Sequence, residues 1–179
     1  MPLHFHRLPD SRLQDGFSLL KRIGDWLESN GRRQRISQTT LETYEQWQAE
    51  QANFFVTQTN DVQAEIVGIV TLRYEVLEQW PRFVDLGPVP MIRGLATDPD
   101  HRGKGVGTFA MKHVLETCPP NAWVFLDCVS DFLPDYYAEL GFQNVDQQVL
   151  EFPGDGHYNV TLMRMRILNS ANLNLANPI

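Results

Sequence analysis

The chain has 179 residues, a formal net charge of −7 and a pI near 5.1, which argues against a nucleic-acid-binding protein. No apolar run approaches the ~20 residues of a membrane span, and the N-terminus has no secretory signal. The two cysteines, Cys118 and Cys128, have neither metal-ligand spacing nor the number that a disulfide framework needs, so we expect a cytoplasmic protein.

The first half of the chain predicts a strand, two helices and a hairpin. Alternating apolar residues over 3–8 indicate the strand, and capping boxes at 11–14 and 39–42 open the two helices. Two β-rich runs, 53–59 and 64–74, are joined by a polar turn and predict the hairpin. The order strand, helix, helix, hairpin therefore leads into the centre of the sequence.

Two features of this half have a functional and a plain interpretation. His4 and His6 share one face of the first strand, where a metal pair is conceivable, but no third ligand is near and a solvated face is favoured. Arg32, Arg33 and Arg35 follow the first helix, and a solvated turn explains them better than a phosphate site does. We predict no metal site.

A long loop precedes the central strand. Residues 75–90 carry three prolines, a glycine and several acids without any period. Loops of this length inside a compact domain are usually functional or mobile.

The centre of the chain reads as a strand, a glycine-rich loop and a helix. The strand covers 91–97, and the helix follows from Thr108 to Glu116. Between them lie three glycines at alternate positions, which lack a Cβ and let the backbone turn tightly beside a ligand. Because the first amides of a helix have no partner inside it, this loop is suited to hold phosphate oxygens.

The spacing separates this loop from two better-known phosphate motifs. A Walker loop has Gly-Lys followed at once by Ser or Thr, whereas here Lys104 precedes Gly105. A dinucleotide fingerprint can be placed on residues 105–110, but such a fingerprint follows its strand immediately, and residues 98–102 intervene here. We therefore reject the first motif and disfavour the second.

The second half predicts a buried strand, a short helix and a final hairpin. The strand covers 123–129, and the helix begins near Pro134 and ends at Gly141 as its C′ residue. Two further strands, 142–152 and 158–167, flank a Pro-Gly-Asp-Gly turn. We expect one domain over 1–168, followed by a loosely held tail at 169–179.

Two motifs together resemble one family. Arg102, Gly105 and Gly107 meet the Arg/Gln-x-x-Gly-x-Gly/Ala pattern of motif A of the GNAT superfamily, the acyl-CoA-dependent N-acetyltransferases. The preceding Leu-Ala-Thr-Asp-Pro at 95–99 is similar to the family's Leu-Ala-Val-x-Pro. Downstream, Tyr-Tyr-Ala-Glu-Leu-Gly-Phe at 136–142 resembles the family's aromatic-Tyr-x-x-Leu-Gly-Phe segment.

The resemblance implies an α+β GNAT fold. It has a mixed, mostly antiparallel central sheet of six to seven strands, about four flanking helices and a splayed strand pair that holds CoA. The implied cosubstrate is acetyl-CoA, bound by the loop and by the backbone of the strand before it. The cofactor-binding residues expected on this basis are Leu95, Ala96, Thr97, Arg102, Gly103, Lys104, Gly105, Val106, Gly107 and Thr108, with Ser130 and Asp131 in place of an Asn that relatives carry.

The same resemblance assigns catalytic roles. Tyr137 matches the family tyrosine that protonates, or hydrogen-bonds to, the departing thiolate; the alternative is a packed helix aromatic. Many relatives place a Glu base where this chain has Met91. The candidates left to face the acceptor are acids of the long loop, Glu75, Glu78 and Asp85, and His157 near the C-terminus.

Three other residues receive plain interpretations beside these assignments. We assign Asp127 a structural role and His101 a solvated loop position. Aromatic residues of the second helix, Tyr44 among them, lie over the acceptor site in relatives, although an aromatic stripe is more often core.

We therefore expect an N-acetyltransferase that transfers an acetyl group from acetyl-CoA directly to a primary amine of a small molecule or peptide. The alternative is a GNAT-fold module that binds acyl-CoA without turnover. The identity of the acceptor cannot be read from the chain, because fold does not fix function. Homodimers are frequent in the family, so a homodimer is a further expectation.

Overall fold

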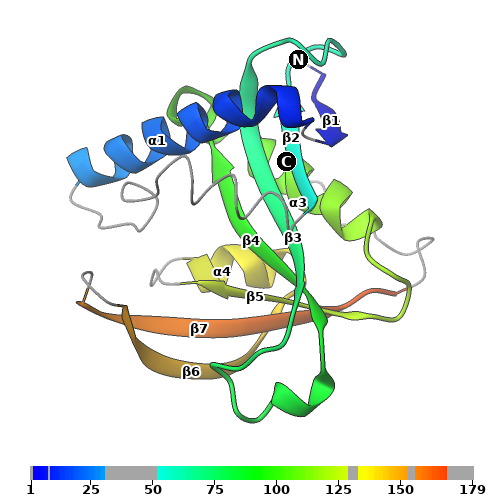
Figure 1. Ribbon diagram of the computed structural model, residues 1–179, viewed down its shortest axis with the longest axis vertical. Helices are drawn as coiled ribbons and strands as arrows, with labels where there is room; N and C mark the ends of the chain where they lie inside the picture. The colour runs from blue at the N-terminus through cyan, green and yellow to red at the C-terminus, as the bar shows by residue number, and fades with distance from the viewer. Residues whose placement is uncertain (1, 8, 31–51, 129–132, 153–155, 169–179) are drawn as a thin grey trace. The chain divides into compact units, whose positions relative to one another are not determined.

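The computed structural model describes residues 2–7, 9–30, 52–128, 133–152 and 156–168. Seven strands follow the order β1-β2-β3-β4-β5-β7-β6 (Figure 1). The β4–β5 pair is parallel, and β1–β2, β2–β3, β5–β7 and β6–β7 are antiparallel, so the expectation of a mixed, mostly antiparallel sheet is confirmed. Three α-helices lie within the described residues; the helix expected from Thr39 lies outside them.

The described chain divides into two compact units, Met1–Leu72 with Gly94–Val114 and Arg73–Arg93 with Leu115–Ile179. The expected single domain over 1–168 stays a prediction, and the tail at 169–179 lies outside the described residues. Within those residues, no helix combines the length and apolar character that crossing a membrane requires.

The first unit begins with strand β1 (His4–Arg7), a 3₁₀ turn η1 (Asp10–Arg12) and helix α1 (Leu13–Ser29). The capping box expected at 11–14 is wrong, because Ser11 lies inside η1 and the N-cap residue is Arg12, without a side-chain cap. Arg12 is instead buried: its Nε donates to Asp15 Oδ2 at 2.7 Å, and its guanidinium lies 5.2 Å from the Phe55 ring centroid.

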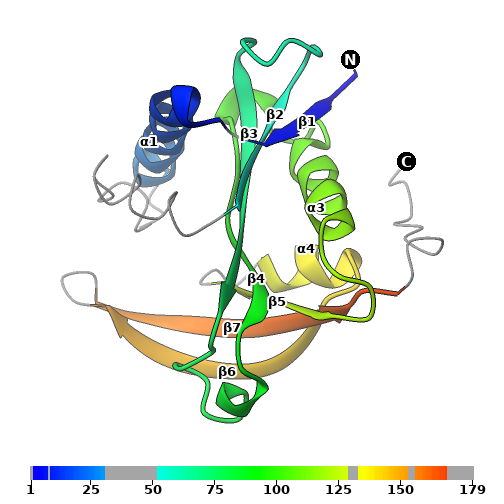
Figure 2. The ribbon, with the colours of Figure 1, turned by 45° about the vertical axis from the view of Figure 1, so that its right-hand side comes forward.

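The rest of the first unit is a layered arrangement around strands β2 (Ala52–Thr57) and β3 (Ile66–Glu75), as the hairpin pattern predicts. Leu19, Ile23 and Leu27 of α1 pack on one face with Phe55 and other buried apolar side chains. Helix α3 (Val106–Glu116) lies on the opposite face (Figure 2). The apolar stripe of α1 thus fixes one side of the sheet and leaves the other to α3.

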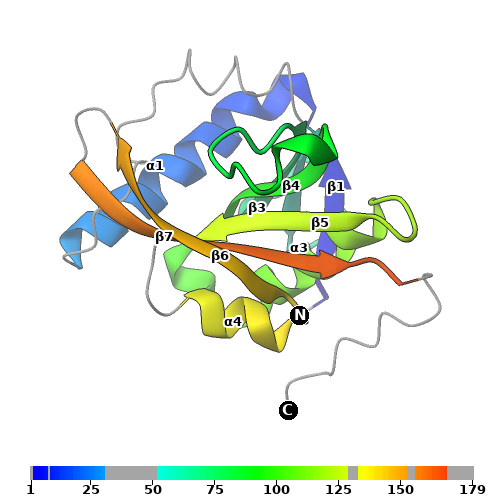
Figure 3. The same cartoon turned by 90° about the horizontal axis from the view of Figure 1, so that it is seen from below.

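The second unit contains strands β5 (Trp123–Cys128), β6 (Gln143–Phe152) and β7 (Gly156–Arg166), and helix α4 (Leu133–Glu139). Strand β4 (Val89–Thr97) enters it through Met91, which pairs with Phe125, and Ile92, which pairs with Leu126. Figure 3 shows α4 beside the β5, β7 and β6 strands. The expectation that β4 and β5 part to hold CoA involves both units and stays a prediction.

The segment between β3 and β4 is a packed part of the second unit and not a bare loop. It contains the 3₁₀ turn η3 (Val84–Leu86), and Trp80 is 2% exposed. Trp80 and Leu77 share a core with Phe125 of β5, and the Phe83 ring meets the Phe125 ring edge-on at 5.8 Å. The sequence did not predict this packing, because the spacing of the three apolar residues matches neither the helical nor the strand period.

Candidate functional site

The glycine-rich loop (residues 102–108) is prepared by the turn before it. Asp98 caps the 3₁₀ turn η4 (Pro99–His101): its carboxylate accepts from the Asp100 N–H at 2.9 Å, and its own N–H donates to the Val67 carbonyl at 2.9 Å. The Asp98 residue is 3% exposed, and Arg22 of α1 forms an ion pair with it at 2.9 Å. Asp98 therefore fixes the start of the loop to β3 through its backbone N–H and to α1 through its carboxylate.

His101 belongs to the same turn and is not the solvated residue expected. Its Nδ1 lies 3.3 Å from Asp98 Oδ1, and the residue is half-buried. This contact with the cap residue Asp98 indicates that the histidine supports the turn.

Two glycines of the loop have backbone angles that other residues rarely adopt. Gly103 has φ +72° and Gly105 has φ +76°, and α3 starts at the next residue, Val106. The Phe109 N–H donates to the Gly105 carbonyl at 2.9 Å, so the amides that precede Phe109 are the orphan donors of the helix N-terminus. Gly107 lies in the first turn of α3 and has no positive φ. The backbone therefore favours glycine at two of the three positions, Gly103 and Gly105.

The space beside these glycines is open. Among the described residues, no atom lies within 4 Å of a Cβ added at Gly103 or Gly105. The loop thus offers amides, the positive end of a helix and open space at one place.

The first turn of α3 is seated by a residue that sequence analysis did not single out. An added Cβ at Gly68 of β3 would lie 2.6 Å from Val106 Cγ1. Only glycine allows Val106, which is buried, to approach β3 so closely. The sequence gives only a weak indication of this role of Gly68, since a lone glycine inside an apolar strand suggests no more than that another segment packs closely against the strand.

The two basic side chains of the loop have partners within the protein. The Arg102 guanidinium lies 3.8 Å from the Trp26 ring centroid of α1, and Lys104 Nζ donates to the Asp100 carbonyl at 2.8 Å. Both residues are exposed. Trp26 was not predicted to belong to this region, because its helix is distant in sequence.

The strand before the loop offers backbone groups and few side chains. Ala96 is buried in the core that α1 covers, while Leu95 and Thr97 are half-buried. Gly94 has φ +59° inside β4, a left-handed residue that breaks the regular strand. The expected role of residues 95–97 therefore rests on their main chain. Ser130 and Asp131 lie outside the described residues.

In the second unit, Tyr137 is held by the end of α4. The Phe142 N–H donates to the Tyr137 carbonyl at 3.0 Å, and the Gly141 N–H donates to the Ala138 carbonyl at 2.9 Å. Gly141 has φ +97°, and the Tyr137 and Phe142 rings meet edge-on at 6.1 Å. This is a Schellman motif, which explains physically why the Leu-Gly-Phe segment has that order. It confirms Gly141 as the C′ residue.

Tyr137 is buried, with 8% of its surface exposed. Burial raises the pKa of its phenol far above the ordinary value, and the neighbouring groups Tyr136, Cys128 and Asp127 raise it further. Burial likewise raises the pKa of Cys128 to about 12, with a further contribution from Asp127. Tyr137 therefore keeps its proton over the whole physiological range and is a hydrogen-bond donor.

Four charged side chains form a row across β3, β4 and β5. Arg93 Nη1 donates to Asp127 Oδ2 at 2.5 Å, and Arg93 Nη2 donates to Glu75 Oε1. Arg73 Nε lies 3.3 Å from Glu75 Oε2. Burial alone would lower the pKa of Arg93, but the charges of Asp127 and Glu75 outweigh it, so the pKa is raised. We call Arg73, Glu75, Arg93 and Asp127 the charged row.

The other residues expected to face an acceptor lie on the surface or in the core. Asp85 is exposed on η3, and His157 is exposed on β7 beside Glu151. Glu78 is also exposed. Met91, at the position of the usual carboxylate, is fully buried against the core that contains Phe125. The structure brings Glu75 into the charged row but does not bring Asp85 or His157 to it.

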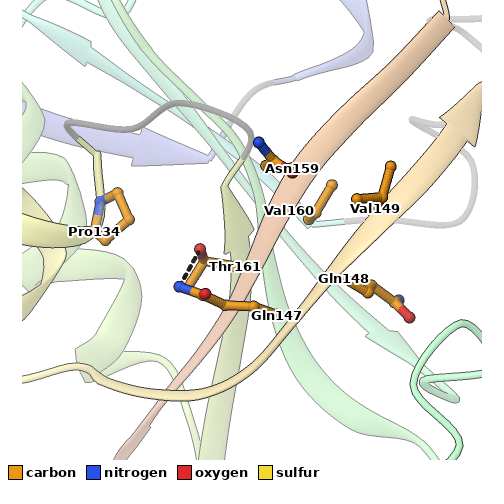
Figure 4. Close-up of a pocket in the computed structure, with 7 residues that line it drawn as sticks. All are labelled: Pro134, Gln147, Gln148, Val149, Asn159, Val160 and Thr161. Atoms are coloured by element: carbon orange, nitrogen blue, oxygen red, sulfur yellow. Dashed lines mark hydrogen bonds between the residues drawn. The ribbon is translucent and has the colours of Figure 1, made fainter.

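A hollow of about 480 Å³ lies on the β6–β7 hairpin next to the start of α4. Figure 4 shows Gln147 turned toward Thr161, to which its Nε2 donates at 3.3 Å, and Gln148 turned away. The lining of the hollow therefore combines neutral amide and hydroxyl groups with valine side chains. Its lining residues are Pro134, Gln147, Gln148, Val149, Asn159, Val160 and Thr161.

The histidine pair on β1 is explained by contacts within the first unit. His6 Nε2 lies 3.1 Å from Thr57 Oγ1, and burial lowers the pKa of His6, helped by the charges of His4 and Arg12. In the described ranges, no group of three or more His, Cys, Asp or Glu side chains could hold a metal ion.

Comparison with solved structures identifies the fold. The ribosomal-protein-S18-alanine N-acetyltransferase from Escherichia coli matches with a TM-score of 0.67 and 16% identity, over 96% of this chain and 97% of that one. NAA60 from Arabidopsis thaliana, in complex with a bisubstrate analogue, matches with a TM-score of 0.69 and 16% identity, over 94% and 100% of the two chains.

A spermidine N-acetyltransferase SpeG chimera from Vibrio cholerae and hSSAT matches with a TM-score of 0.65 and 21% identity, over 97% of this chain and 99% of that one. A comparison with curated proteins finds no match. The family model described as Acetyltransferase (GNAT) family matches residues 20–142, which include the glycine-rich loop, the charged row and Tyr137. This chain belongs to the GNAT acetyltransferase family.

Proposed function

We propose that this acetyltransferase uses acetyl-CoA to acetylate a primary amine directly. The observation that carries the proposal is the glycine-rich loop, where two positive-φ glycines lead into the N-terminus of α3 with open space beside them. A solved structure of NAA60 from Arabidopsis thaliana, similar in fold, is a complex with acetyl-CoA.

The loop is proposed to bind the pyrophosphate of CoA. The backbone amides from Gly103 to Thr108 would donate to its oxygens, and the dipole of α3 would favour the negative charge. Arg102 would leave or share its position over Trp26 to reach a phosphate. The main chain of Leu95 and Thr97 would form hydrogen bonds with the amide groups of the pantetheine arm. The Ala96 side chain belongs to the core and would take no part in this contact.

Acetyl-CoA supplies an activated acyl group with a thiolate leaving group. We propose that Tyr137 donates a hydrogen bond to that thiolate as it departs. A full proton transfer from Tyr137 is disfavoured, because burial raises the pKa of its phenol well above the value near 8.5 that is typical of a thiol. The donated hydrogen bond still stabilises the charge that grows on sulfur.

We propose that the acceptor is an amine of a small molecule or a peptide. The related structures include N-acetyltransferases named for the alanine of ribosomal protein S18 and for spermidine, which supports either a protein or a small-molecule acceptor. The hollow on the β6–β7 hairpin, with its neutral polar lining, is a candidate place for part of the acceptor. Cytoplasmic location and homodimer formation remain predictions.

The test follows CoA release with a thiol reagent while a panel of amines is presented: spermidine, a peptide that begins with alanine, and a peptide with an internal lysine. Calorimetry with acetyl-CoA measures binding separately. Release above background with at least one amine supports the enzyme. Binding without release from any amine favours the non-catalytic acyl-CoA module, which the buried Met91 at the usual base position makes the second candidate. Absence of binding contradicts both.

A further inference from the structure

The charged row contains two carboxylates with different surroundings. Both oxygens of Glu75 are engaged, one by Arg93 and the other by Arg73 at 3.3 Å. Asp127 uses Oδ2 alone, which accepts from Arg93 at 2.5 Å. In the part of the chain that the structure describes, Asp127 Oδ1 has no hydrogen-bond or ion-pair partner.

We propose that Asp127 is the proton acceptor for the amine that is acetylated. This role rests on the proposed function, and it replaces both the structural role that the sequence suggested for Asp127 and the assignment of Glu75 as a candidate base. Of the two carboxylates in the row, Asp127 is the one with an oxygen, Oδ1, that can take a proton without first losing a hydrogen bond.

The position of Asp127 keeps this oxygen fixed and partly accessible. The residue lies next to the end of β5, where Asp127 pairs with Leu162 of β7, and its side chain is 17% exposed. Arg93 is clamped between Glu75 and Asp127, so it orients the Asp127 carboxylate through Oδ2. Arg93 is thus a positioning residue for the Asp127 carboxylate.

Asp127 lies in the same unit as Tyr137, so the proposed proton acceptor and the proposed hydrogen-bond donor belong to one part of the molecule. From β4 it faces Arg93, and beyond Arg93 lie Glu75 and Arg73 of β3. The charge of Asp127 helps to raise the pKa of the Tyr137 phenol on α4. It also helps to raise the pKa of the Cys128 thiol on the same strand as Asp127. A protonated phenol and an ionised carboxylate are the two groups that amide formation from a thioester needs at the sulfur and at the nitrogen, respectively.

Acetyl transfer moves one proton from the amine to CoA. The lone pair of the neutral amine forms the C–N bond at the thioester carbonyl, and the C=O π electrons move to the oxygen until they re-form the carbonyl as the thiolate leaves. The nitrogen becomes positively charged and acidic. Asp127 Oδ1 takes its proton. The C–S bond then breaks, and its electron pair leaves on sulfur, which Tyr137 stabilises by its hydrogen bond. The proton on Asp127 passes through solvent to the thiolate, so that amide and CoA thiol are the products and Asp127 is again ionised.

The test compares Asp127→Asn with Glu75→Gln. Each variant removes one negative charge from the same partner, Arg93, and each keeps the side-chain size, so a merely structural role predicts similar losses. We expect Asp127→Asn to lower kcat by about 100-fold and Glu75→Gln by no more than about threefold, with the amine of the panel that turns over fastest. Calorimetry should give unchanged acetyl-CoA affinity for both variants.

Chemical rescue gives the second readout. Asp127→Ala opens space for a small carboxylate, so added formate should restore part of kcat in proportion to its concentration, whereas chloride at equal ionic strength should not. Glu75→Ala should show no such rescue. A role of Asp127 limited to folding would give no formate dependence.

The outcomes separate this proposal from the proposed function. Equal losses in Asp127→Asn and Glu75→Gln, or no rescue by formate, overturn the role of Asp127 while the wild-type turnover still supports the acetyltransferase. Absence of turnover by the wild-type protein with every amine overturns the proposed function and the role of Asp127 with it.

Discussion

The glycine-rich loop and the charged row differ in what builds them. The loop consists of consecutive residues, and its shape comes from main-chain angles at Gly103 and Gly105 and from the start of α3. The charged row takes its side chains from three strands, and each position depends on sheet register. A site made of backbone is therefore encoded locally, whereas a site made of side chains exists only after the strands have paired.

Gly105→Asp should give the largest effect, because it tests whether backbone alone makes the phosphate site. At φ +76° any side chain is strained, and a carboxylate would face the expected phosphate. We expect acetyl-CoA affinity to fall by at least about 100-fold in calorimetry. Gly105→Ala is the control for strain: it should lose about 1–2 kcal/mol of stability and bind more tightly than the aspartate variant. Equal affinities for wild type and Gly105→Asp would contradict the assignment of this loop.

Tyr137→Phe should give the next effect and tests the side-chain half of the comparison. The phenylalanine ring keeps the contact with Phe142, so the Schellman motif and the fold should persist. We expect kcat to fall about 10- to 100-fold with little change in acetyl-CoA affinity, because the lost hydrogen bond acts on the departing thiolate.

The pH dependence of kcat gives a second test of the role of Tyr137. Since burial raises the pKa of Tyr137, the phenol is protonated below and somewhat above pH 10, so the wild-type kcat should not fall near the ordinary tyrosine value. A decline in wild-type kcat at about pH 10 that is absent in Tyr137→Phe would contradict the buried, protonated phenol.

Asp98→Ala asks how far the backbone site depends on one side chain. The buried carboxylate caps η4 and pairs with Arg22 Nη2 at 2.9 Å, so its removal leaves the Asp100 amide and Arg22 Nη2 without this acceptor. We expect a loss of about 1–3 kcal/mol in the free energy of unfolding from urea titration. Glu65→Gln removes the exposed partner of Arg22 at 3.4 Å and should cost less than about 0.5 kcal/mol. Similar losses for the two variants would contradict a special role of Asp98.

The same contrast explains what sequence could predict. The loop, its helix and the Leu-Gly-Phe motif were predicted because glycine at a positive φ and apolar periodicity are local signals. Gly68 and Gly94 were not singled out, because their roles depend on Val106 and on the course of β4.

Charged residues were harder still. Glu75 was predicted to face the acceptor, but the sequence could not show that Arg73 and Arg93 engage both of its oxygens. Asp127 was assigned a structural role, because the sequence does not show which side chains of the adjacent strands contact a carboxylate within a strand. Met91 marked a missing base without indicating where another lies. The pairing of β4 with β5 brings Arg93 beside Asp127, the residue that we propose as the proton acceptor.

Arg102→Met should give the smallest effect and tests whether the charge of the loop adds to its backbone. Arg102 stacks over Trp26 at 3.8 Å, so its removal should cost about 0.5–1 kcal/mol of stability. If the guanidinium also reaches a phosphate, acetyl-CoA affinity should fall about threefold to tenfold, and the dependence of the affinity on salt should weaken. Lys104→Met, which removes a charge bound to the Asp100 carbonyl, is the matched control. An unchanged affinity and salt dependence in Arg102→Met would mean that this arginine serves α1 through Trp26, and that main-chain amides alone hold the phosphate.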